Sequence, residues 1–236
     1  MYDRRMPSPA PSPAFCRPAA FAALVRHLPE VETPEGLFRA AWAIALHERP
    51  DADLAAGEIV VDNLASAVHR RVRSREPEAL VTHLHDLLFD VLGFRGNDEN
   101  YYSPGNSYLP EVLRTRRGLP ISLTLVYRRV AAGVGLVVHG LNAPGHFLAE
   151  VELDDGGERR SMVVDPFFGG SVLNEQEVFE RIVQATGQAV EPSREHLARA
   201  TGRQWLTRML HNLQAAFASA GRERDVYAMQ ELEGLL

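Results

Sequence analysis

Ser122, His146 and Asp165 are the residues of this sequence whose types and positions suit nucleophilic chemistry. Ser122 lies in the first turn of an expected helix, His146 begins an expected strand, and Asp165 follows the next one. A histidine can accept the proton of a hydroxyl or thiol group, and an aspartate can hold that histidine in orientation. Such a set attacks acyl carbons, so it suits amide or ester hydrolysis and acyl transfer.

Each of these three residues also has a purely structural interpretation. A serine in the first turn of a helix can satisfy a free backbone N–H group. His146 can be a strand-start residue bonded to Asp165, and Asp165 followed by Pro166 is typical of a turn. The site hypothesis therefore depends on whether the chain brings Ser122 to His146.

Residues 94–118 are rich in glycine, asparagine, tyrosine and proline, which is typical of a long ordered loop that can carry function. Four polar side chains of this loop could line a cleft or only order the loop, namely Tyr101, Tyr102, Asn106 and Tyr108. Arg114, Arg116 and Arg117 precede the helix that contains Ser122, and they could bind a carboxylate or phosphate.

Metal ligands and cofactor motifs are not indicated. His83 and His85 are two residues apart on an expected helix, so their side chains point in different directions and a shared metal is not expected. The single cysteine, Cys16, excludes an internal disulfide and a cysteine-rich zinc site. The basic run over residues 69–75 reads as a solvated helix end. We expect neither a metal nor a cofactor.

The spacing of apolar residues predicts the elements that must position these side chains. Helices are expected over residues 21–28, 35–48, 53–74, 78–92, 109–116, 120–132, 205–220 and 225–235, and strands over 136–141, 147–153 and 161–164. In the third helix, the apolar face is expected to contain Ile59, Val60, Leu64 and Val68. The helix over 120–132 is apolar on nearly all sides, so it should be buried. Residues 147–153 alternate apolar and acidic, as in an antiparallel sheet, with a turn at 154–157.

The bulk composition is that of an ordinary globular protein. The 236 residues are 45% hydrophobic and 24% charged, with a net charge of -6 spread along the chain. Nothing here favours a nucleic-acid or membrane partner. The first residues alternate prolines and lack the apolar region of a secretory signal, so a cytoplasmic location and a disordered tail are expected.

Three strings carry a resemblance to a known family. The chain reads FRGNDENYYSPGNSYLPEVLRTRRGLPISL from Phe94, NAPGHFL from Asn142 and VVDPFFGG from Val163, and RMLHNL follows at Arg208. In this order the strings resemble the SirB family, a bacterial branch of the transglutaminase-like proteins. The resemblance implies a Cys-His-Asp site in which His146 is the base and Asp165 its orienter. The candidate binding residues are Tyr101, Asn106, Tyr108 and Asn142.

The sequence departs from that pattern at the nucleophile. On the family's register the cysteine position falls on Pro120, and the nearest hydroxyl belongs to Ser122. Two functions remain open. The first is a non-catalytic binding or regulatory protein that retains the His–Asp cleft for a protein or peptide partner. The second is an amide or ester hydrolase, or an acyltransferase, that uses Ser122 with His146 and Asp165.

The expected fold class is α+β. A transglutaminase-like core over residues 94–185 would pack one buried helix against a small antiparallel sheet. It would follow a disordered tail over 1–18 and a helical region over 19–93. A helical hairpin that resembles one tetratricopeptide unit is expected over 186–236, and a single such pair should pack on the core.

Overall fold

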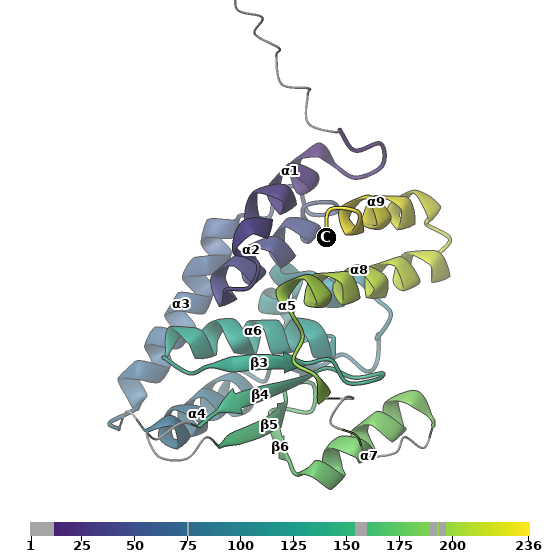
Figure 1. Ribbon diagram of the computed structural model, residues 1–236. Coiled ribbons are helices and arrows are strands. Elements are labelled where there is room, and N and C mark those ends of the chain that lie inside the picture. The colour runs from purple at the N-terminus through teal and green to yellow at the C-terminus, as the bar shows by residue number, and fades with distance from the viewer. Residues whose placement is uncertain (1–11, 75, 154–159, 189–192, 194–196) are drawn as a thin grey trace, which may run out of the picture.

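The computed structural model describes residues 12–74, 76–153, 160–188, 193 and 197–236. The chain is α+β, as expected. Figure 1 shows a four-stranded sheet with one helix, α6 (Pro120–Gly133), lying along it, and further helices stacked on the other side of α6. Eleven residues of α6 are buried, so this helix is the centre of the core.

The N-terminal half of the chain forms the helical layer. Its elements are α1 (Pro18–His27), η1 (Leu28–Glu30), α2 (Pro34–Ala45), α3 (Leu54–Arg71), α4 (Pro77–His85) and η2 (Asp86–Val91), the last a stretch of π-helix. The side chains of Thr33 and Asp53 accept backbone N–H groups at the starts of α2 and α3, which explains where these helices begin. Helix α2 is buried on almost every side because it contacts both α1 and α6.

The expected apolar face of α3 is wrong at two positions. Ile59 and Val60 are 60% and 43% exposed, and the buried face contains Val61, Ala65 and Val68. Small residues on this face allow α3 to pack closely against its neighbours. A side chain at Gly57 would clash with Trp42, and a Cβ at Gly133 of α6 would lie 2.7 Å from Ala65. Close approach of the helices therefore outweighed the burial of two larger side chains.

The sheet has the order β3-β4-β5-β6, and all its neighbours are antiparallel. Its strands are β3 (Val138–Leu141), β4 (Leu148–Glu152), β5 (Ser161–Asp165) and β6 (Ser171–Leu173). The first three were expected, whereas β6 was not. The expected turn at 154–157 lies outside the described residues. In β4, Ala149 and Val151 are fully buried and the two glutamates are half-buried, which confirms the alternation.

The loop over residues 94–118 is ordered by short elements. They are β1 (Arg95–Gly96), η3 (Pro104–Ser107), α5 (Leu109–Thr115) and β2 (Arg117–Gly118), and β1 pairs with β2 in parallel. This pairing brings the beginning of the loop beside the start of α6.

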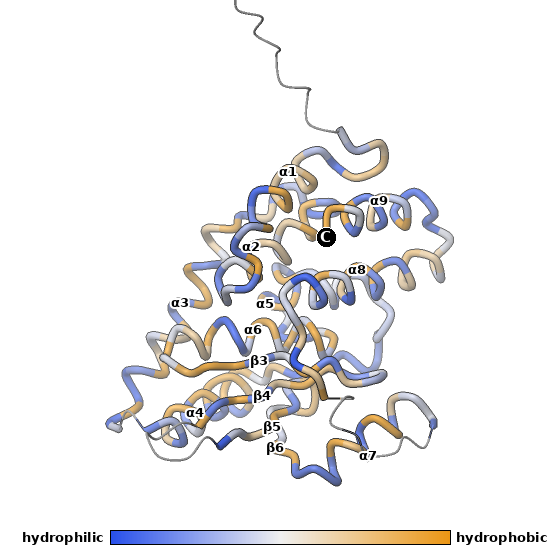
Figure 2. The backbone as a smooth tube through the Cα atoms, viewed as in Figure 1, coloured by the Kyte–Doolittle hydropathy of each residue, from blue (hydrophilic) through white to orange (hydrophobic). Residues whose placement is uncertain are grey.

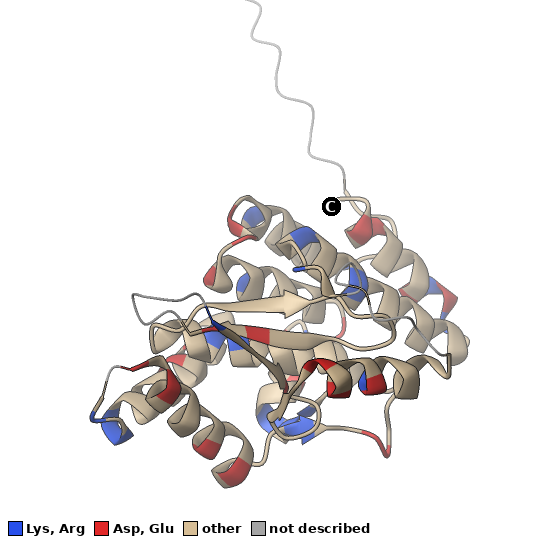
Figure 3. Cartoon of the chain, turned by 60° about the horizontal axis from the view of Figure 1, so that its bottom comes forward, with Lys and Arg blue, Asp and Glu red and all other residues tan. Residues whose placement is uncertain are grey.

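The described part of the chain after β6 contains the helices α7 (Glu175–Thr186), α8 (Gly202–Ser219) and α9 (Glu223–Glu233). Hydrophobic and hydrophilic residues alternate around them in Figure 2, as in amphipathic helices. Helices α8 and α9 pack as an antiparallel pair, with α8 contacting α2 and α6, and α7 lies next to β6 at the end of the sheet. In the view of Figure 3, acidic and basic residues are interspersed along the helices and strands.

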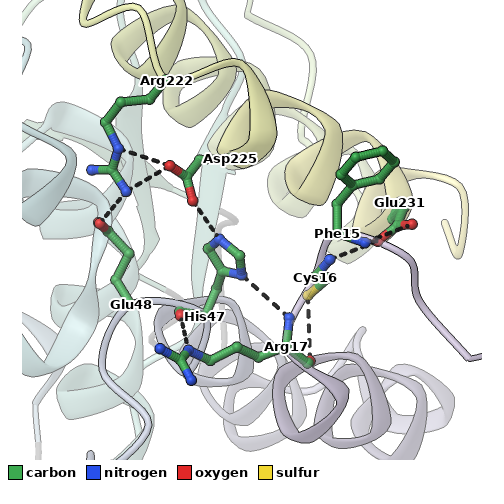
Figure 4. Close-up of polar contacts among 8 residues, drawn as sticks. All are labelled: Phe15, Cys16, Arg17, His47, Glu48, Arg222, Asp225 and Glu231. Atoms are coloured by element: carbon green, nitrogen blue, oxygen red, sulfur yellow. Dashed lines mark hydrogen bonds and ion pairs between the residues drawn. The ribbon is translucent and has the colours of Figure 1, made fainter.

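The expected disordered tail over 1–18 includes residues 12–18, which the structure describes. Residues 1–11 lie outside the described residues, but α1 already begins at Pro18, and Figure 4 shows the preceding segment held against α9. The backbone N–H groups of Ala14, Phe15 and Cys16 donate to the Glu231 carboxylate at 2.7 to 3.1 Å. A partner more than two hundred residues away holds this segment, which a local composition cannot predict.

Candidate functional site

His146 and Asp165 meet at one end of the sheet. Residue 146 lies two positions before β4, and Asp165 is the last residue of the neighbouring strand β5. His146 Nε2 lies 2.9 Å from Asp165 Oδ2. Both side chains are buried, with 6% and 0% exposed. With its proton on Nε2, the ring donates to Asp165 and presents Nδ1 as an acceptor.

The other Asp165 oxygen is used by the backbone. The N–H groups of Phe167 and Phe168 donate to Oδ1 at 3.1 and 3.4 Å, an Asx-type turn typical of aspartate before proline. Arg181 Nε of α7 lies 3.5 Å from Oδ2, and its guanidinium stacks 4.0 Å above the Phe168 ring. Asp165 therefore orients His146 and also fixes the loop that follows β5.

A cleft of about 410 Å³ opens beside His146, and we call it the His146 cleft. Aromatic residues form much of its wall, and they are Tyr101, Tyr102, Phe167 and Phe168. Pro120 lines it at the start of α6, and Arg181 and Gln184 line it from α7. An aromatic wall with a few polar groups is typical of a small-molecule or peptide site.

Glycines allow the aromatic wall to close against the core. A Cβ at Gly96 would lie 2.4 Å from the Phe167 ring, so only glycine permits this contact. Gly170 has a φ of 75°, and a Cβ there would lie 2.1 Å from Phe89. Phe89 belongs to the π-helical stretch η2, so η2 supports the loop that carries Phe167 and Phe168.

Ser122 bonds to groups at and before the start of α6. Its side chain is fully buried, its hydroxyl donates to the Asn106 carbonyl at 2.6 Å, and it accepts the Leu119 N–H at 3.0 Å. Ser122 is not among the described residues that line the His146 cleft, and no hydrogen bond joins it to His146 in the described part of the chain. The hydroxyl instead satisfies groups at the start of α6.

The four candidate binding residues have different surroundings. Tyr101 lines the His146 cleft, and burial raises the pKa of its phenol. Asn106 is buried and donates to the carbonyls of Asn100 and Tyr101, so it shapes the loop. Tyr108 is fully buried, and burial raises its pKa strongly. Asn142 lines a second cavity, next to the His146 cleft.

The structure places several residues in the cleft that the sequence did not single out for it. Phe167 and Phe168 were visible only as part of the VVDPFFGG string, and Pro120 only as the residue at the cysteine position. Arg181 and Gln184 had no signal, because they lie on an amphipathic helix whose packing against the site is a tertiary contact.

The arginines before α6 serve local structure. Arg116 and Arg117 donate to the carbonyls of Leu92 and Gly93 at the end of η2, where a cation is favourable. Arg114 pairs with Glu111.

His85 bonds to the Tyr127 hydroxyl at 2.9 Å. Within the described residues, no group of three metal-binding side chains is present, and no helix is long and apolar enough to cross a membrane.

Comparison with known proteins agrees with this fold. Residues 57–211 match the family model described as the transglutaminase-like superfamily, and the chain belongs to that superfamily. It is 35% identical over 190 residues to a UPF0162 protein of Xylella fastidiosa strain 9a5c, which covers 79% of this chain and 66% of the relative. A UPF0162 protein of Pseudomonas aeruginosa is 28% identical over 195 residues, covering 80% of this chain and 68% of the relative.

A shorter match joins the chain to a eukaryotic protein. F-box only protein 21 of Mus musculus is 44% identical over 62 residues, which is 26% of this chain and 10% of that protein. The chain spans 66% of the length of the Xylella relatives. No solved structure gives a significant match.

Proposed function

We propose that this chain is a non-catalytic member of the transglutaminase-like superfamily, of the SirB type, that binds a peptide or acyl ligand in the His146 cleft. The observation that carries the proposal is the presence of Pro120 in the cleft wall with His146. On the family's register this is the nucleophile position, and proline has no group that can attack a carbonyl. Nδ1 of His146 therefore has no thiol to deprotonate.

Binding remains possible without a nucleophile. The cleft combines a buried, oriented imidazole with aromatic side chains and the Gln184 amide. Aromatic walls contribute apolar contact area, and a few fixed polar groups orient a ligand. We also propose that helices α8 and α9 form a tetratricopeptide-like pair that packs on this core.

The alternative is a serine hydrolase or acyltransferase that uses Ser122, His146 and Asp165. For that reaction the Ser122 hydroxyl must leave the Asn106 carbonyl and come within about 2.6–3.2 Å of the His146 ring. It would also need backbone N–H groups as an oxyanion hole. The first turn of α6 has free N–H groups, but in the observed conformation Ser122 helps to satisfy that turn.

Activity measurements separate the two functions. A panel of activated esters and amides, together with a serine-reactive fluorophosphonate probe, is tested on the wild-type chain and on Ser122→Ala and His146→Ala. We expect no labelling at residue 122 and no turnover above that of the variants. Turnover that disappears in both variants would overturn the non-catalytic proposal and make the serine enzyme the better account.

A further inference from the structure

A second cavity of about 560 Å³ adjoins the His146 cleft, and we call it the Arg208 cavity. The two share Gly145, at the tip of the loop over residues 142–145. Helix α8 supplies the other wall through polar side chains, namely Gln204, Thr207, Arg208, His211 and Asn212. Among the described residues that line it, none is an aspartate or a glutamate.

Arg208 is held in a fixed orientation. One terminal nitrogen, Nη1, donates to the Ala143 carbonyl at 2.8 Å and also to the side-chain oxygen of Asn142. The guanidinium carbon lies 5.5 Å from the centre of the Phe147 ring. The other two guanidinium nitrogens, Nε and Nη2, form no hydrogen bond to the described part of the chain. A guanidinium edge with this pair of donors matches the two oxygens of a carboxylate.

The charge of Arg208 is not balanced locally. Two other arginines of this region each have a carboxylate partner, Arg181 with Asp165 and Arg199 with Glu150. Arg208 forms no ion pair with any described residue. Burial lowers its pKa, and the group close enough to act on its charge is the phenol of Tyr101, which lines the His146 cleft. A partly desolvated cation without a counter-charge favours an anionic ligand.

We propose that Arg208 forms a carboxylate-binding subsite for the ligand of the His146 cleft. This inference rests on the proposed binding function. A ligand in the cleft that extends past Gly145, which lines both cavities, can place a carboxylate against Nε and Nη2 of Arg208. The carboxylate can belong to an acidic side chain or to the end of a peptide, and both present the same chemistry.

Three small probes distinguish these sources. N-acetylglutamate α-amide has only a side-chain carboxylate, N-acetylglutamine has only a terminal carboxylate, and N-acetylglutamine amide has none. Each is titrated into the full-length chain, and the backbone amide of Gly145, the ring of His146 and the Nε–H of Arg208 are followed by NMR. We expect at least one carboxylate probe to bind about tenfold more tightly than the neutral probe, and to shift the Arg208 signal.

Variants of Arg208 test its role directly. Arg208→Gln should bind all three probes equally, whereas Arg208→Lys should retain part of the preference because it keeps the charge but not the paired donors. Arg224→Gln, which removes an exposed arginine of α9, should behave as wild type. Melting temperatures are recorded for each variant. If Arg208→Gln does not fold, the comparison of wild type with Arg208→Lys decides the test.

The outcomes separate this inference from the proposed function. If all probes shift His146 equally and no Arg208 variant changes this, the subsite is overturned and the binding function stands. If the carboxylate probes shift Arg208 but leave His146 unchanged in every titration, Arg208 binds carboxylates at a separate site, and both the proposed function of the cleft and its link to Arg208 are overturned. Failure of the carboxylate probes to shift Arg208 at millimolar concentration overturns the subsite.

Discussion

Pro120, the first residue of α6, lines the same cleft as the His146 imidazole that Asp165 orients. In a thiol enzyme this is the place where a helix N-terminus and a histidine together stabilise a thiolate. On the proposed register Pro120 occupies the nucleophile position, and this relationship leads to the first prediction.

Pro120→Cys, made in a Cys16→Ala chain, should produce a reactive thiol. The N-terminus of α6 and a nearby imidazolium should lower the pKa of the new thiol below its ordinary value of about 8.5. We expect alkylation by iodoacetamide near pH 6 to be about tenfold faster than for free cysteine. The pH dependence of the alkylation rate measures this pKa. Adding His146→Ala should remove much of the acceleration, and a rate equal to that of free cysteine would contradict the retained site.

The contact between Glu231 and the N-terminal segment should weaken in acid. Burial acts to raise the pKa of Glu231, but the N–H groups of Cys16, Phe15 and Ala14 outweigh it and hold the pKa below its usual value. A lowered carboxyl pKa adds stability above the unfolded-state pKa, and that stability is lost as the pH falls through the folded-state pKa. Release of the segment should then expose Cys16, which is 4% exposed and whose pKa burial raises to about 12.

The accessibility of Cys16 measures this release. Its reaction with an aromatic disulfide that attacks thiols in acid is compared with that of free cysteine across the pH range. The normalised rate should rise below the folded-state pKa of Glu231, and Glu231→Gln should raise it already at neutral pH. Glu233→Gln is the matched control, since Glu233 contacts His211 and Gln214 instead. Equal rates in wild type and Glu231→Gln would refute the role of this carboxylate.

His85 should make the protein less stable between about pH 6.5 and pH 4. Burial lowers the pKa of His85 to about 4, so the unfolded chain binds a proton in this range while the folded chain does not. Stability is therefore present above the unfolded-state pKa and decreases as the pH falls. The loss contributed by His85 should reach roughly 2–3 kcal/mol. Urea unfolding at a series of pH values should show a flatter dependence for His85→Gln, and an unchanged dependence would count against this assignment.

Phe217→Ala should destabilise the whole chain. Phe217 of α8 is fully buried, and the Arg222 guanidinium lies 4.4 Å from its ring centre. Removing a buried aromatic ring leaves a cavity and costs about 3 kcal/mol or more. Denaturant unfolding should show one cooperative transition at lower denaturant concentration. A loss confined to α8 and α9, with the rest of the chain unchanged, would mean that this pair is an independent module.

Most elements were predictable because their signals are local. The apolar spacing over 120–132 predicted the buried helix α6, and the alternation over 147–153 predicted β4 in an antiparallel sheet. The order of the strings containing His146 and Asp165 implied their pairing, which the 2.9 Å contact confirms. The short strand β6 was missed because three residues carry too little periodicity.

The tertiary structure alone decided the features that depend on distant contacts. Sequence reasoning could not tell that Ser122 bonds to Asn106 rather than facing His146, because that choice depends on how a loop packs. Arg181 reaches Asp165 only because α7 folds back on the sheet, and Ala14 reaches Glu231 across 217 positions of the chain. Residue types and their local spacing thus determined which groups could perform chemistry. Packing between elements, which local spacing does not encode, decided which of those groups meet.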